Sequence, residues 1–139
     1  MKKIIIIYIL NICFFTLEAQ VNQSFQEIKK YLNENNTEYS EGIADDGKHY
    51  IMYLDSFRNN KYMKGCYFEE DICFQWVFFL PISCINDIIK SMNENFVKLK
   101  YHLTWKDYKT NLLYRIDNES DRNIEGSFVF ICTVDKNKE

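Results

Sequence analysis

The chain has 139 residues, is 47% hydrophobic and 17% aromatic, and carries a formal net charge of −3. This length fits a single domain. A mildly acidic chain without a basic cluster lacks the electrostatic footprint of a nucleic-acid-binding protein. The histidines and cysteines show no metal-ligand spacing such as HExxH or CxxC. The sequence therefore predicts no metal, no haem and no other cofactor.

The first 19 residues have the pattern of a secretory signal peptide. Two lysines precede an apolar run, and Ala19 supplies the small residue expected just before the cleavage site. The apolar run is too short for a permanent membrane anchor. A lipoprotein signal with Cys13 as the lipidated residue is disfavoured, because Ile12 stands where a small residue belongs. We expect an exported protein, periplasmic or extracellular, whose mature chain is one domain over residues 20–139.

A short amphipathic helix is expected at the start of the mature chain. Ser24 has the character of an N-cap, and Glu27 three residues later completes a capping box. The asparagine-rich segment 33–36 favours a turn and should end the helix. Strands are then predicted over Thr37–Ile43 and His49–Asp55, with a turn between them at an Asp-Asp-Gly sequence.

Residues 62–80 contain the densest aromatic block and predict a β-hairpin. Three acidic residues at 69–71 mark its turn. With Tyr67 opposite Ile72, Cys66 lies opposite Cys73, and one side of the hairpin, carrying Trp76, forms the core. An oxidising compartment would allow a Cys66–Cys73 disulfide, with Cys84 and Cys132 paired together or reduced in the core. Two reduced thiols on a half-covered face are the open alternative.

The second half begins at Pro81, which should end the hairpin. A helix capped by Ser83 is expected to run to about residue 95, followed by strands over 97–103, 112–117 and 127–134. The sequence shows no internal repeat. The predicted class is α+β: a mostly antiparallel sheet of about six to seven strands in the order α-ββββ-α-βββ, with two helices on one face. This order is similar to secretion-chaperone-like folds, which implies topology alone.

Few residues suggest chemistry. Cys84 falls in the first turn of a predicted helix, where the helix dipole can lower a thiol pKa, but a small buried hydrophobe is the simpler interpretation. His49 and His102, the two histidines, each have a structural explanation on a strand. Trp105 and Tyr108 form a possible binding patch, against the alternative that Trp105 is a lid over the end of the core.

These patterns favour a non-enzymatic binding or interaction module of the bacterial cell envelope, with a protein or an envelope component as its partner. The lysine-, asparagine- and tyrosine-rich, glycine- and proline-poor composition resembles that of chains from AT-rich bacterial genomes. That bias accounts for part of the aromatic content. The competing hypothesis is a small hydrolase or thiol enzyme that uses Cys84 with a histidine.

Overall fold

The computed structural model describes residues 20–117 and 126–137. This part of the chain folds into one antiparallel sheet with two α-helices, so the predicted α+β class is confirmed. In chain order the elements are α2 (Phe25–Glu34), β1 (Tyr39–Ile43), β2 (His49–Phe57), β3 (Asn60–Glu69), β4 (Ile72–Pro81), the 3-10 turn η1 (Ile82–Cys84), α3 (Ile85–Asn95), β5 (Val97–Lys98), β6 (Thr104–Asp107), β7 (Leu112–Asp117) and β8 (Ser127–Val134).

The sheet has eight strands in the order β1-β2-β3-β4-β8-β7-β6-β5, slightly more than the six to seven expected. The difference comes from residues 97–107. The alternation over 97–103 predicted one long strand, but the structure has only the two-residue β5 there, and β6 lies where a loop was expected. The backbone turns between them, and Leu103 takes a positive φ of 46°. The alternating hydrophobicity therefore marked neither a continuous strand nor a half-buried one, since Val97 and Tyr101 are 52% and 74% exposed.

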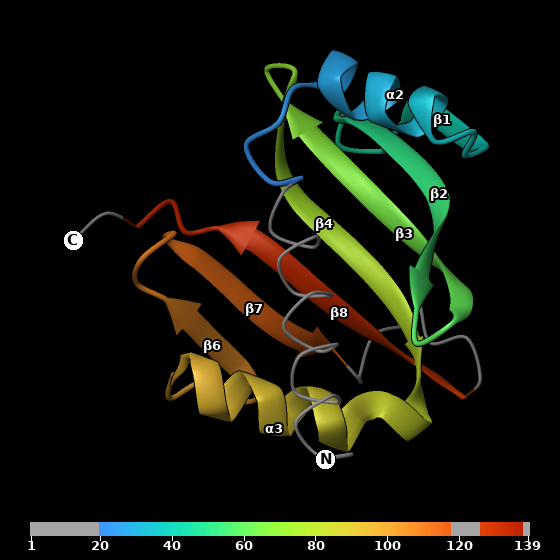
Figure 1. The fold of residues 1–139 in the computed structure, drawn as a ribbon. Helices are drawn as coiled ribbons and strands as arrows, with labels where there is room; N and C mark the ends of the chain where they lie inside the picture. Colours follow the sequence, from blue (N-terminus) through green and yellow to red (C-terminus); the bar gives the residue numbers. More distant parts are fainter. Residues whose placement is uncertain (1–19, 118–125, 138–139) are drawn as a thin grey trace.

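The topology repeats once. Each half is a helix followed by four consecutive antiparallel strands, and the last strands of the two halves, β4 and β8, pair at the centre of the sheet. Figure 1 shows α2 across one half of the sheet and α3 across the other. The sequence predicted no repeat, and none is visible in its residues. The repeat is therefore a property of the backbone arrangement.

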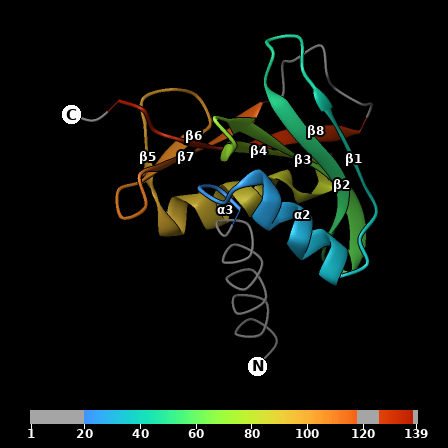
Figure 2. The ribbon, with the colours of Figure 1, turned by 90° about the horizontal axis from the view of Figure 1, so that it is seen from above.

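Both helices lie on the same face of the sheet, which we call the inner face (Figure 2). Ile28 and Leu32 of α2, and Ile88 and Met92 of α3, are almost completely buried in the main core. Burial of each such side chain contributes about 1.5–3 kcal/mol, so the helices are held mainly by packing on the sheet. The sheet supplies the largest core residues, Trp76, Phe78, Trp105, Tyr114, Phe128 and Phe130.

The central hairpin is present, but its predicted register is wrong. Its turn is the two-residue Glu70–Asp71, with Glu69 paired to Ile72, and a bulge follows. Both turn residues have positive φ, 50° and 64°. Phe74 is the extra residue of the bulge, since Phe68 pairs with Cys73 and Tyr67 with Gln75.

The bulge changes which residues face the core. Cys66 lies opposite Trp76, and Phe68 lies opposite Cys73. These four side chains are buried in the main core, whereas the sequence placed Cys66 and Cys73 on the half-covered side, away from Trp76. The assignment of Trp76 to the core is confirmed.

Among the described residues, no helix has both the length and the apolar character needed to cross a membrane.

Candidate functional site

The face of the sheet opposite the helices carries an apolar surface, which we call the outer patch. Strand alternation and pairing bring its side chains together from β2, β3, β4 and β8. Leu54 and Met63 face each other across β2 and β3 and remain 48% and 39% exposed. On β4 and β8, Val77, Val129 and Ile131 are only 2%, 3% and 8% exposed and form a small buried cluster, against which the partly buried Tyr67 and Phe79 pack. The outer patch consists of Tyr50, Met52, Leu54, Met63, Tyr67, Val77, Phe79, Val129 and Ile131.

Two glycines make this surface level. A Cβ atom at Gly65 would lie 2.5 Å from the Met52 Sδ atom, and one at Gly42 would lie 2.6 Å from the Tyr50 hydroxyl oxygen. The Met52 and Tyr50 side chains therefore lie flat across the glycines of the neighbouring strands. A glycine inside a strand commonly marks such a close approach. The result is a continuous apolar surface in place of separate projecting side chains.

Charged residues surround the outer patch. On the outer side of β3, Lys61 and Glu69 stand at the two ends of the strand. On the outer side of β7, Arg115 pairs with Ile131 and is exposed. The outer positions between these charges, from Tyr50 to Phe79 on β2, β3 and β4, carry no ionisable group other than tyrosine. An apolar centre with a charged rim is the usual anatomy of a protein-binding surface.

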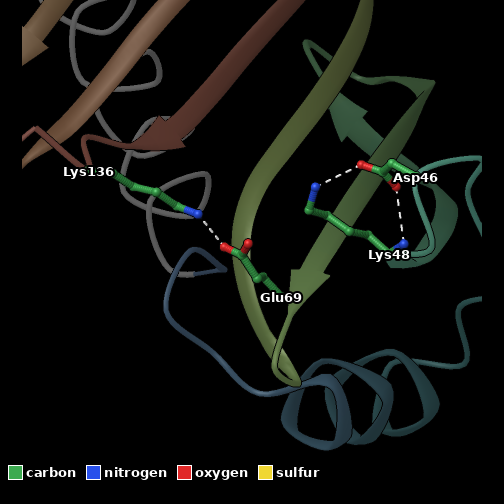
Figure 3. Close-up of polar contacts among 4 residues, drawn as sticks. All are labelled: Asp46, Lys48, Glu69 and Lys136. Atoms are coloured by element: carbon green, nitrogen blue, oxygen red, sulfur yellow. Dashed lines mark hydrogen bonds and ion pairs between the residues drawn. The ribbon is translucent and has the colours of Figure 1, made fainter.

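The sheet end that carries the β1–β2 and β3–β4 turns has a shallow hollow of about 340 Å³ between them. Four charged side chains meet near it in two pairs (Figure 3). The Lys48 ammonium is 2.8 Å from the Asp46 carboxylate, and Lys136 pairs with Glu69. Both ammonium groups also lie 5.5 Å from the Phe74 ring centroid, on the bulged residue.

These pairs also shift the pKa values of the charged groups. The hydrogen bond from Lys48 lowers the pKa of Asp46, and the hydrogen bond from Lys136 lowers that of Glu69. The same bond to Asp46 raises the pKa of Lys48. Because both carboxylates already have cationic partners, the outer patch is the better candidate for binding.

The inner face contains one fully buried cation. Lys64 of β3 is 0% exposed, and its ammonium lies 3.3 Å from a carboxylate oxygen of Asp55, whose side chain is 35% exposed. The ammonium is also 5.2 Å from the Trp76 ring and 5.7 Å from the Phe78 ring. Within the described structure, the Trp76 indole Nε1 is buried without a hydrogen-bond partner. The lysine is therefore held by one carboxylate and two aromatic faces.

A buried polar network lies beside Lys64. The Gln20 amide donates to the Tyr53 hydroxyl, and its oxygen accepts from the Cys66 thiol at 3.8 Å. Cys66 also contacts the Cys73 thiol and the Tyr53 hydroxyl. The hydrogen bond from Cys73 lowers the pKa of Cys66, and the same bond raises the pKa of Cys73. Burial raises the pKa of the Tyr53 hydroxyl. Sequence reasoning missed this network, because it placed Cys66 on a half-covered face.

The predicted disulfide is not present. Cys66 and Cys73 are diagonal neighbours in the true register, and within residues 20–117 and 126–137 all four cysteines are buried thiols. The expectation failed because it required Cys66 directly opposite Cys73. The two-residue turn pairs Cys73 with Phe68, and the bulge beyond that pair places Cys66 opposite Trp76. Cys84 and Cys132 are not joined to each other either.

The structure does not bring Cys84 and His49 together. The Cys84 thiol accepts from the Arg58 guanidinium at 3.9 Å, and Arg58 also pairs with Asp87 at 2.9 Å. Arg58 follows the end of β2, whereas His49 begins that strand. The nine residues of β2 span about 26 Å. His102 is exposed in the loop between β5 and β6.

The structure also separates Trp105 from Tyr108. Trp105 is fully buried on β6, and its indole nitrogen donates to the Asn93 side chain of α3 at 2.8 Å. Tyr108 lies in the following turn and is 66% exposed, with the Lys106 ammonium 4.9 Å from its ring centroid. The two residues therefore form no common binding patch, and Trp105 closes the core under α3.

Comparisons with known proteins identify no relative: no family model, no curated protein and no solved structure matches this chain. Among the described residues, no group of three or more His, Cys, Asp or Glu side chains is placed to hold a metal ion.

Proposed function

We propose that this protein is an exported, non-catalytic binding module of the bacterial cell envelope, and that the outer patch is the surface that binds its partner. One observation carries the proposal. Both described helices cover the inner face, and the opposite face carries exposed Leu54 and Met63 beside partly buried aromatic and methionine side chains, packed against the buried cluster of β4 and β8. Contiguous apolar patches are rare on the surfaces of globular domains, and where they occur they commonly mark interaction sites.

The composition of the outer patch supports a protein or an envelope component as the partner. Its central side chains include Tyr50, Tyr67, Met52 and Met63, and tyrosine and methionine are enriched at the centres of protein interfaces. Tyrosine also supplies a large contact area with few rotatable bonds. The charged rim would fix orientation more than it would add affinity.

The alternative, a hydrolase or thiol enzyme that uses Cys84, has less support. The thiol is buried against Arg58, and His49 lies at the far end of β2. A nucleophile and its base must lie within hydrogen-bond reach of each other. The contacts of Cys84 therefore favour a structural role, in which the thiol and Arg58 hold the start of α3 in place.

Export is tested by intact-mass measurement on protein made in its native host. We expect a chain that begins at Gln20. A species that retains Met1, or one that carries a lipid on Cys13, would show that the signal-peptide assignment is incorrect.

The binding surface is tested by site-specific photo-crosslinking in the native host. A photoreactive amino acid at Leu54 should give one discrete adduct, which is lost when Met63→Lys places a charge in the outer patch. The same amino acid at Tyr101, an exposed loop position, is the matched control and should not give that adduct. An adduct of twice the chain mass would identify the partner as a second copy. If Leu54 gives no adduct, or if Met63→Lys leaves the adduct unchanged, the outer patch is not the binding surface.

A further inference from the structure

Gln20 is held on the inner face by hydrogen bonds of its side chain and of the backbone segment that follows it. Its side chain is only 6% exposed, and the two ends of its amide bond Tyr53 and Cys66. The next residues hold the backbone in place. The Asn22 amide donates to the Cys73 carbonyl at 2.8 Å, and the Cys73 amide donates to the Gln23 carbonyl at 2.8 Å. The chain is therefore tied to the start of β4 immediately after Gln20.

An N-terminal glutamine has a characteristic intramolecular reaction. Its α-amino nitrogen attacks the side-chain carbon Cδ, the bond from Cδ to Nε2 breaks, and ammonia leaves with a proton from the amine. The product is the five-membered lactam pyroglutamate, which has lost the N-terminal charge. No oxidant or other reactant is needed.

We propose that Gln20 is a protected amino terminus: after the signal peptide is removed, the folded domain retains an uncyclised glutamine because the inner face binds its amide. This inference rests on the proposed export and cleavage after Ala19. The amide nitrogen, which would be the leaving group, donates to Tyr53, and the oxygen accepts from Cys66. Cyclisation would withdraw the amide from both.

The Gln20 amide is protected from cyclisation because the loss of its two hydrogen bonds costs free energy. The Tyr53 hydroxyl and the Cys66 thiol are both buried, so each would lose a hydrogen-bond partner that water does not replace. The reaction therefore requires local opening of the segment 20–23, whose backbone is itself bonded to β4. Folding and cyclisation become competing events for the newly cleaved chain. Gln20 serves the fold as an anchor only while its amide is intact.

The test follows the mass of the exported chain over time. Protein secreted by the native host is purified folded and incubated at neutral pH, with a matched sample held unfolded in urea. The folded sample should largely keep the full mass of residues 20–139. In the unfolded sample, the loss of one ammonia molecule should be at least about tenfold faster than in the folded sample.

Variants identify the bonds that protect the amide. Tyr53→Phe combined with Cys66→Ala should raise the cyclisation rate of the folded protein about tenfold. Tyr101→Phe, at an exposed tyrosine, is the control and should leave it unchanged. Circular dichroism must show that the variants remain folded. Pyroglutamate in the freshly folded protein, or equal rates in the folded and unfolded samples, would overturn the proposal. A different amino-terminal residue would also overturn it, and that outcome alone would count against the proposed cleavage site.

Discussion

Lys64 is the residue whose burial most needs an explanation, because a fully buried cation is costly unless it is paired. Its partner Asp55 reaches solvent, so the two members of the pair differ in what they lose. Without the lysine, Asp55 can be hydrated. Without the aspartate, the ammonium stays buried with only aromatic faces around it.

This asymmetry predicts unequal effects of two substitutions. Lys64→Met removes the buried charge and keeps an unbranched chain against Trp76, so the free energy of unfolding should change by less than about 1 kcal/mol. Asp55→Ala should cost about 3 kcal/mol, because it leaves the cation unpaired. Urea denaturation of both variants provides the measurement.

The double variant is the control for this interpretation. In the Lys64→Met background, Asp55→Ala should cost much less than it does alone, because no buried cation remains to be neutralised. A larger cost for Lys64→Met than for Asp55→Ala would contradict the assignment of Asp55 as the group that makes the buried charge tolerable.

The turn residue Asp71 predicts a stabilising substitution. Its φ of 64° is costly for a residue with a Cβ atom and is accessible to glycine. Asp71→Gly should therefore raise the free energy of unfolding by roughly 1 kcal/mol, since the two-residue hairpin turn favours glycine at this position. Asp45→Gly is the control: Asp45 also lies in a hairpin turn, but its φ is not positive. Equal effects at the two positions would show that backbone strain at Asp71 is not the cause.

At the scale of single elements, α2 was predictable because its signals are local. Ser24 caps the helix, and the capping box with Glu27 is present as expected. The bond from the Ser24 backbone amide lowers the pKa of Glu27. Cap, apolar stripe and terminating asparagines all lie within about twelve residues, so tertiary context was not needed.

The capping box predicts a defined loss of stability. Ser24→Ala removes the side chain that accepts from the Glu27 amide at 3.2 Å, and it should lower the free energy of unfolding by about 1 kcal/mol. Ser24→Asp retains an acceptor at the cap and should stay close to the parent protein. Thermal or urea unfolding measures both variants. If alanine and aspartate behave alike, the cap does not contribute to stability.

In the central hairpin, local sequence signals predicted some features and failed to predict others. The acidic turn and the core position of Trp76 could be predicted from residue type, but the register could not. The two-residue turn places Cys73 opposite Phe68, and the bulged residue Phe74 then moves the partner of Cys66 to Trp76. The position of the turn explains the failed disulfide. The bulge puts Cys66 on the same face as Trp76, which explains the missed polar network around Gln20. Bulges are set by packing and twist in the complete sheet, so a two-strand pattern does not contain them.

For the whole molecule, the layer arrangement was predictable and the symmetry was not. Amphipathic helices and short connections predict helices on one face of an antiparallel sheet. The central pairing of β4 with β8, which produces the repeated helix and four-strand unit, joins residues that lie far apart in the sequence, from Pro81 with Ser127 to Gln75 with Thr133. The outer patch depends on that pairing too, because β8 contributes Val129 and Ile131 to it.

The charge pairs of the whole molecule predict its pH dependence. Within residues 20–117 and 126–137, four carboxyl groups have a pKa below the usual 3.8 of Asp or 4.5 of Glu, mainly because backbone amides or lysines hydrogen-bond their charged forms; these are Glu27, Asp46, Glu69 and Asp135. Two lysines have a pKa above the usual 10.5, because carboxylates bond them; these are Lys29 and Lys48.

The sign of the effect follows from proton binding. As the pH falls through about 4.5, the unfolded chain binds protons on these carboxyl groups before the folded chain does, so the free energy of unfolding decreases. The stabilisation is complete above this pH and is lost as the pH falls through the lowered folded values. At the alkaline end, the raised lysines lose their contribution as the pH rises beyond about 10.5. The raised pKa of the buried Tyr53 hydroxyl acts in the same direction from its usual value of 10.0. Stability should therefore be greatest between about pH 4.5 and about pH 10.

Urea denaturation from pH 7 to pH 3 tests the acid side, and Glu69→Gln provides a matched variant. The substitution removes one carboxyl whose pKa is lowered by the Lys136 ammonium. It should make the acid decline shallower, because one fewer group takes up a proton on unfolding. Added salt should also weaken the decline, since the Lys48–Asp46 and Lys136–Glu69 pairs are exposed to solvent. A free energy of unfolding that stays constant or rises between pH 7 and pH 3 would contradict the assignment of these carboxylates as stabilising partners.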